Sequence, residues 1–208
     1  MALAFAGPLS RFFARDAADA ARLRVGVEAW CEDLRASVAD KLKAQLVWDE
    51  GSAVACTAEL GDAGWMALRL FAFYAERSEL ELPDTVPPLL ELDAQWRAAA
   101  DGKFGKSRFG HLLACRVWLP GDFPVTLKAP LPDGETAEIG SVDVLAGQLR
   151  RLNEQTFAAD VAAVASWSTL PAPPGGDLLD AARRGYAGLW AAVAAAVRAR
   201  VPVIVREV

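Results

Sequence analysis

The sequence predicts a single α+β domain spanning residues 1–208, with a mixed or antiparallel sheet of about four or five strands covered by about five helices. Stretches with strand and helix periodicity are interspersed along the chain. Two short strands flank a turn at Pro132–Gly134. The composition, 53% apolar and 24% charged, is typical of a folded domain. A chain of this length can bury roughly 70% of its unfolded surface.

The first predicted element is one long helix, or two, over residues 16–46. Its apolar residues recur at steps of three or four and so form one face of a helix. Asp16 and Asp19 lie at its start, where the helix dipole favours negative charge, and Gly26 would allow a break in the middle. The apolar face consists of Leu23, Val27, Cys31, Leu34, Val38, Leu42 and Leu46.

A strand and two further helices are predicted next. Side chains alternate between two faces over residues 52–60, which indicates a strand. The segment from Asp62 to about Arg77 is apolar around most of a helix circumference, which indicates a buried helix. Pro88 suits the first turn of a helix from about residue 88 to residue 100.

The clearest strand pattern covers His111–Leu119. One set of its alternate residues is entirely apolar, and the other contains Arg116 and Trp118. A hairpin is predicted after it, with arms at Phe123–Lys128 and Glu135–Ile139.

Helices dominate the C-terminal third. Ser141 is well placed as the N-cap of a helix to about Phe157, and helical character resumes over Val161–Trp167. Pro171–Gly176 then interrupts all regular structure. About 32 residues follow it, too few for a separate core, so we expect a surface loop within one domain.

The last predicted elements are a helix from Asp177 to about Arg200 and a β-branched strand at Val201–Val205. Small residues recur at steps of three or four along the helix, which would let it lie close against the sheet or the first helix. These small residues are Ala181, Gly185, Gly188, Ala192 and Ala195.

Charge and cysteine content restrict the function classes. The net charge of −5 is unlike the basic face typical of nucleic-acid binding, and it disfavours anionic membranes. Ala187–Val197 is too short to span a bilayer, and Met1–Ala6 is too short for a signal peptide core. Three cysteines without paired spacing fit a reducing compartment, so we expect a cytoplasmic protein. The alanine- and arginine-rich composition favours GC-rich coding and a bacterial source.

The chain carries few groups suited to catalysis. Histidine-dependent catalysis would rest on one residue, His111. Cys31, Cys56 and Cys115 are too far apart in the sequence for the usual zinc spacing. Gly102–Ser107 ends like a phosphate-binding loop, but the first glycine of that motif is an alanine here. We therefore expect no catalytic set, no metal and no cofactor.

One segment contains a local basic cluster that could hold an anionic group or an acidic partner. Two tryptophans flank it and are expected to be partly exposed, where they could contact a ligand or a protein. The candidate binding residues are Lys103, Lys106, Arg108, His111, Trp96 and Trp118.

The leading hypothesis is a non-enzymatic protein that binds another macromolecule, such as an adaptor, a regulator or an immunity-like protein. Its positive support is the seven tryptophans, a residue type enriched at interface hot spots. The alternative is a small-ligand-binding protein or enzyme that holds an anionic group in loop 103–111, with His111 transferring a proton. A third hypothesis is a homo-oligomer formed through exposed aromatic side chains. We expect a protein partner or a second copy, and neither nucleic acid nor membrane.

Overall fold

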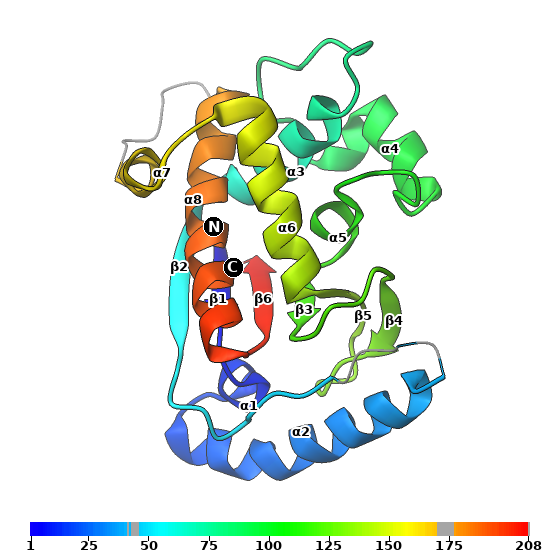
Figure 1. Cartoon of the computed structure of the whole chain (residues 1–208), viewed down its shortest axis with the longest axis vertical. Coiled ribbons are helices and arrows are strands. Elements are labelled where there is room, and N and C mark those ends of the chain that lie inside the picture. Colours follow the sequence, from blue (N-terminus) through cyan, green and yellow to red (C-terminus); the bar gives the residue numbers. More distant parts are fainter. Residues whose placement is uncertain (41, 43–45, 170–176, 208) are drawn as a thin grey trace.

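The computed structural model describes residues 1–40, 42, 46–169 and 177–207, and it has the predicted α+β architecture (Figure 1). The described residues form a mixed sheet of six strands in the order β2-β1-β6-β3-β5-β4, slightly more strands than expected. The strands are β1 (Ala2–Ala6), β2 (Cys56–Gly61), β3 (Val117–Leu119), β4 (Leu127–Pro130), β5 (Thr136–Ser141) and β6 (Val203–Glu207).

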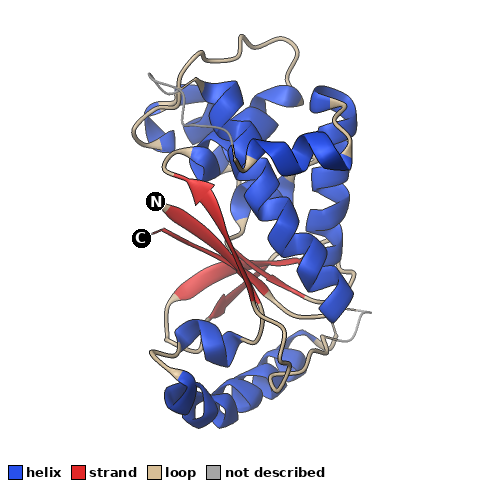
Figure 2. Cartoon of the chain, turned by 90° about the vertical axis from the view of Figure 1, so that its left-hand side faces the viewer, coloured by secondary structure: helices blue, strands red, loops and turns tan. Residues whose placement is uncertain are grey.

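Helices cover both faces of the sheet (Figure 2). Helices α3, α5, α6 and α8 contribute to a larger core on one face, and α1 and α2 contribute to a smaller core on the other. The helices are α1 (Leu9–Phe13), α2 (Ala17–Val38), α3 (Gly64–Ala75), α4 (Ala94–Asp101), α5 (Gly110–Ala114), α6 (Val142–Leu152), α7 (Val161–Trp167) and α8 (Leu178–Ala199), with a 3-10 turn η1 (Leu90–Leu92) and a π-helical segment η2 (Asn153–Phe157).

Strand β1, which the sequence analysis did not predict, lies inside the sheet. It pairs antiparallel with β2 on one side and with β6 on the other. Strand β6 is also antiparallel to β3, and β5 is parallel to β3 and antiparallel to β4. The β4–β5 pair is the predicted hairpin, but its first strand begins at Leu127, four residues later than the predicted Phe123.

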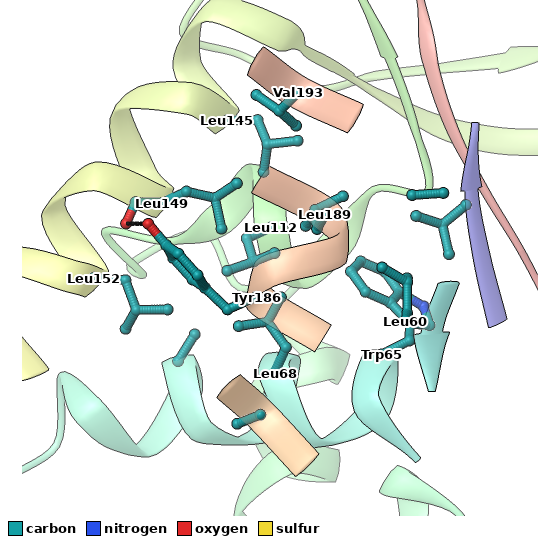
Figure 3. Close-up of a cluster of buried hydrophobic side chains, with 14 of the residues drawn as sticks. Leu60, Trp65, Leu68, Leu112, Leu145, Leu149, Leu152, Tyr186, Leu189 and Val193 are labelled. Carbon is teal, nitrogen blue, oxygen red and sulfur yellow. Dashed lines mark hydrogen bonds between the residues drawn. The ribbon is translucent and has the colours of Figure 1, made fainter. Parts of the chain in front are cut away.

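The larger core is built around α8. Figure 3 shows Tyr186 of α8 between Leu149 and Leu152 of α6 and Leu68 of α3. The Tyr186 hydroxyl donates a hydrogen bond of 3.2 Å to the Leu149 carbonyl oxygen. A buried hydroxyl without a partner would cost free energy, so this bond lets a large aromatic ring fill the space between the helices.

Helix α8 lies very close to α3 and β2 because glycines face both neighbours. A Cβ atom on Gly185 would lie 2.1 Å from the carbonyl oxygen of Gly64 in α3. A Cβ atom on Gly188 would lie 2.3 Å from the carbonyl oxygen of Glu59 in β2. The small residues therefore allow α8 to lie close to a strand of the sheet, as expected. The neighbouring helix that they approach is α3, not the first predicted helix.

The predicted strand His111–Leu119 is wrong over its first half. Residues 110–114 form the single-turn helix α5, and β3 begins only at Val117. The Leu113 and Cys115 N–H groups donate to the carbonyl oxygens of Phe109 and His111. A short run that is apolar at consecutive positions fits a buried helical turn as well as a strand, so periodicity does not separate the two.

The predicted helix from Pro88 also begins later than expected. Helix α4 starts at Ala94 because the Asp93 side chain accepts a 2.8 Å hydrogen bond from the Trp96 N–H and so caps it. A capping carboxylate satisfies an N–H group that the first helical turn leaves unpaired, whereas Pro88 lies before η1 and caps no helix.

Other boundaries differ by a few residues. The predicted helix over residues 16–46 ends at Val38 in the structure. Ser141 caps α6 as predicted, accepting from the Val144 N–H, but α6 gives way to η2 after Leu152. The predicted loop Pro171–Gly176 lies outside the described residues. Among the described helices, none is long and apolar enough to cross a membrane.

We expect Gly185→Ala to lower the free energy of unfolding by roughly 1–3 kcal/mol, because the added methyl group meets backbone atoms that cannot rotate away. Urea denaturation followed by circular dichroism measures the change. Gly147→Ala in α6 is the matched control, since nothing lies within 4 Å of its added Cβ. The control is expected to gain up to about 1 kcal/mol. Equal stability of the two variants would contradict the close packing of α8.

Candidate functional site

In the predicted basic loop the cationic side chains are exposed, whereas an aromatic side chain between them is buried. Lys103, Lys106 and Arg108 are exposed. Between them, Phe104 is buried, and its ring lies 4.7 Å from the ring of Trp96. The loop is therefore held to the larger core by its aromatic side chain, while its charges face solvent.

The prediction that Trp96 and Trp118 are partly exposed is wrong. Trp96 is 2% exposed and Trp118 is fully buried. The Trp118 Nε1–H donates a 3.1 Å hydrogen bond to the His111 carbonyl oxygen. Helices cover both faces of β3, where Trp118 lies, whereas the exposed Arg116 precedes the strand.

His111 is buried and both of its ring nitrogens are engaged. Nδ1 accepts a 2.9 Å hydrogen bond from the Ser141 N–H, and Nε2 lies 3.2 Å from the Pro124 carbonyl oxygen. Since the Ser141 N–H can only donate and a carbonyl oxygen can only accept, the ring is neutral with its proton on Nε2. Burial lowers the pKa of His111. In this geometry His111 joins α5 to the end of β5 and has no ring nitrogen free for proton transfer.

The structure contains a different candidate site, at a place where the sheet is incomplete. Strand β3 has three residues, whereas its neighbours β5 and β6 have six and five. Residues 136–138 of β5 pair with β4 on one side, and residues 206–207 of β6 pair with β1 on one side. On the sides that face each other, these five residues pair with no described strand, although Arg116, just before β3, already accepts a hydrogen bond from the Val205 N–H and lies opposite Glu138 in the register. We call this gap the notch.

The notch opens into a pocket of about 900 Å³. Its lining comes from β5, β6, the β4–β5 turn, the segment between α5 and β3, the end of α1, and α3. Figure 2 shows the strands fanning apart toward the side of the molecule where the two ends of the chain lie. Because residues of both β5 and β6 line it, together with residues of α1 and α3, the pocket lies between these two strands.

Arg69 of α3 is the most unusual residue of the pocket. Its Nε donates a 3.1 Å hydrogen bond to the Leu113 carbonyl oxygen, and its Nη2 donates to the same oxygen. The Arg69 Cζ atom lies 5.2 Å from the ring centroid of Trp65 and 4.9 Å from that of Trp96, within the range of cation–π attraction. No carboxylate of the described residues forms a salt bridge with it.

Burial lowers the pKa of Arg69 to about 10, and the charge of Glu207 opposes part of that effect. The guanidinium is therefore still charged near pH 7. A charge removed from water without an opposite charge costs free energy. Arg69 thus lines the pocket as a positive charge whose neighbours are rings and a carbonyl oxygen.

The other charged residues of the pocket are three arginines and four carboxylates, and most of them lie closer to solvent. Arg116 and Glu135 form an ion pair of 2.5 Å whose side chains are 44% and 59% exposed. Exposed pairs of this kind contribute little to stability. The other charged residues lining the pocket are Arg15, Arg206, Asp133, Glu138 and Glu207.

The sequence analysis did not identify the notch or Arg69, but one signal was present. Arg69 is the sole charged residue of α3, which is otherwise apolar and mostly buried. A charge in the middle of a buried helix requires partners, so the sequence pattern alone is enough to make Arg69 a candidate functional residue. The notch itself leaves no such signal in the sequence.

Cys31, Cys115 and the metal-ligand residue types of the described part of the chain offer no further site. Burial raises the pKa of the Cys31 thiol to about 12 and also raises the pKa of Cys115. Both thiols are therefore protonated near pH 7, and a protonated thiol is a poor nucleophile. Within the described residues, no three His, Cys, Asp or Glu side chains form a group that could hold a metal ion.

Comparisons with protein-family models, with curated proteins and with solved structures found no match to this chain.

The free energy of unfolding is expected to fall as the pH drops below about 6.5. The unfolded chain binds a proton at His111 near that pH, while the folded state resists protonation because burial lowers the pKa of His111. The stability that depends on neutral His111 is present above pH 6.5 and is lost as the pH falls toward the lowered pKa.

Urea denaturation of the wild type and of His111→Gln between about pH 5 and pH 8 tests this expectation. A glutamine can accept from the Ser141 N–H and does not titrate, so the variant is expected to lose less stability on acidification. Identical pH dependence of the two proteins would contradict the role of His111.

Proposed function

We propose that this protein acts by binding a partner protein, and that an extended segment of the partner docks in the notch. The unpaired edges of β5 and β6 carry the proposal. An exposed strand edge presents unpaired N–H and C=O groups that readily pair with another chain. Addition of a partner strand to such an edge is a recurring mode of peptide recognition.

The lining of the notch supports a protein partner. Arginine and aromatic residues are enriched at interface hot spots, and the pocket combines Arg69 and Trp65 with Phe12 and Phe13 at the end of α1. The Phe12 and Phe13 rings contact each other edge to face with centroids 5.0 Å apart. These groups offer apolar contact beside the strand edges that supply hydrogen bonds.

Binding without catalysis is the better supported mode of action. His111 has both ring nitrogens engaged in the core, and the Cys31 and Cys115 thiols are buried. An adaptor, a regulator or an immunity-like protein fits this description. The buried free cysteines also support a reducing, cytoplasmic location.

The alternative, a small anionic ligand held by the basic loop, has weaker support. Of its six candidate residues, three are buried and engaged in the core. Lys103, Lys106 and Arg108 alone form an exposed basic segment, and lysines commonly occupy loops without a ligand. Ligand binding by this loop stays a prediction. Variants of the loop serve as controls for variants of the notch.

Photo-crosslinking in cells tests the proposal. Benzoylphenylalanine replaces Thr136 on β5 or Arg206 on β6, both exposed at the notch. The matched control carries it at Arg151, an exposed position on α6. We expect both notch positions to crosslink to the same partner and the control to give no adduct with it.

A double variant, Lys103→Glu with Lys106→Glu, separates the notch from the basic loop. The notch adduct is expected to be unchanged by this charge reversal, because the two lysines do not line the pocket. Loss of the adduct in the double variant would favour the loop. An adduct with a second copy of this chain, or none from either notch position, would overturn the proposal of a different partner at the notch.

A further inference from the structure

The notch has the geometry of a missing strand segment. Strand β3 lies between β5 and β6, with Val117 paired to Ile139 on one side and to Ile204 on the other. Adjacent strands lie about 4.8 Å apart, so β5 and β6 are separated by roughly 9.6 Å where β3 lies between them, and they diverge beyond it (Figure 2). The gap beyond Arg116 admits one extended chain, which could bond to residues 136–137 and 206–207.

Side chains of an inserted segment would point alternately to the two faces of the sheet. One of these faces is covered by α3, which carries Arg69. A side chain pointing toward α3 would therefore approach the Arg69 guanidinium, which lines the pocket. The chemistry of this guanidinium determines which side chain suits the position.

Arg69 is held in one orientation. Its Nε and Nη2 groups are fixed by the Leu113 carbonyl oxygen, and the Trp65 and Trp96 rings lie within 5.2 Å of its Cζ atom. A guanidinium has five N–H donors in a fixed plane, so donors remain for a ligand. A planar carboxylate is the acceptor that matches them in charge and geometry.

We infer that the segment docking in the notch carries an aspartate or glutamate side chain whose carboxylate pairs with Arg69. The inference rests on the proposed function, and it adds the chemical class of the partner residue. The carboxylate supplies an ion-pair partner, which Arg69 does not have among the described residues. Because the guanidinium is already oriented by Leu113, little additional ordering is needed on binding.

Two carboxylates of the chain itself oppose the incoming one. Glu207 of β6 acts on Arg69 at long range, and Glu138 of β5 lines the same pocket. Neither forms a salt bridge with Arg69. Removal of the Glu207 charge therefore favours the partner carboxylate, and Glu207→Gln should tighten its binding by up to about fivefold.

Nuclear magnetic resonance of the wild-type protein tests the inference without a variant of Arg69. The probes are acetyl-Val-Glu-Val-amide and its matched control acetyl-Val-Gln-Val-amide, titrated while the Arg69 Nε–H signal is followed. We expect a saturable shift with the glutamate peptide, a much smaller one with the glutamine peptide, and tighter binding of the glutamate peptide to Glu207→Gln. Equal shifts with both peptides, or no shift with either, would overturn the inference.

The crosslinking experiment distinguishes this inference from the proposed function. Arg69→Gln keeps one donor for the Leu113 carbonyl but removes the charge, and circular dichroism checks that it folds. We expect it to lose most of the partner adduct formed from position 136. An undiminished adduct would show that the partner docks in the notch without an ion pair, which overturns the inference alone. Absence of any notch adduct in the wild type overturns the proposed function itself.

Discussion

The hydrogen bonds from the Arg69 guanidinium to the Leu113 carbonyl oxygen hold the end of α5 in place. The position of α5 in turn limits how far β3 can extend beside β5 and β6. The last carbonyl groups of a helix have no partner within the helix, and they carry partial negative charge that attracts a cation. Arg69 meets this requirement for α5 and ties the helix end to α3. His111 ties the start of α5 to Ser141 at the end of β5.

The position of α5 explains the length of β3. With residues 110–114 fixed as a helical turn, the chain first meets the sheet at Arg116, whose carbonyl oxygen accepts from the Val205 N–H, and β3 begins at Val117. Strands β5 and β6 have no such restriction and continue past it. The notch therefore results from the fixed position of α5, whose start is held by His111 and whose end is held by Arg69. It does not depend on a flexible loop.

Arg69 is half-buried at the pocket, so part of the cost of removing its charge from water applies to it. Burial of a charge costs several kcal/mol, whereas cation–π contacts contribute roughly 0.5–2 kcal/mol and hydrogen bonds involving a charged group about 1.5–3 kcal/mol. These terms are of similar size, so the arginine adds little net stability. An apolar side chain of similar volume among Trp65 and Trp96 would be neutral or stabilising. A site that requires a positive charge gives a physical reason for arginine at this position.

Much of the fold could be predicted from local patterns. The face of Val27, Cys31, Leu34 and Val38 is buried in α2 as expected, and the all-apolar segment forms the buried helix α3. These predictions succeed because periodicity reports on burial within one element. Strand β1 was missed because five small or apolar residues at the start of a chain carry no turn or cap signal of their own.

The exposure of the predicted binding residues could not be judged in the same way. Whether a tryptophan in a strand is buried depends on what covers each face of that strand. Trp118 lies two residues after the exposed Arg116, but Arg116 precedes β3, and helices cover both sides of that strand.

The notch depends on a relation among three strands. Its boundary is set by the register that joins Val117, Ile139 and Ile204, residues far apart in the sequence. Each of those strands looks ordinary by itself, and only their unequal ends create the gap. A lone charge in a buried helix is the one local trace of such a site, because an arginine surrounded by apolar residues must find its partners in neighbouring elements or in a ligand.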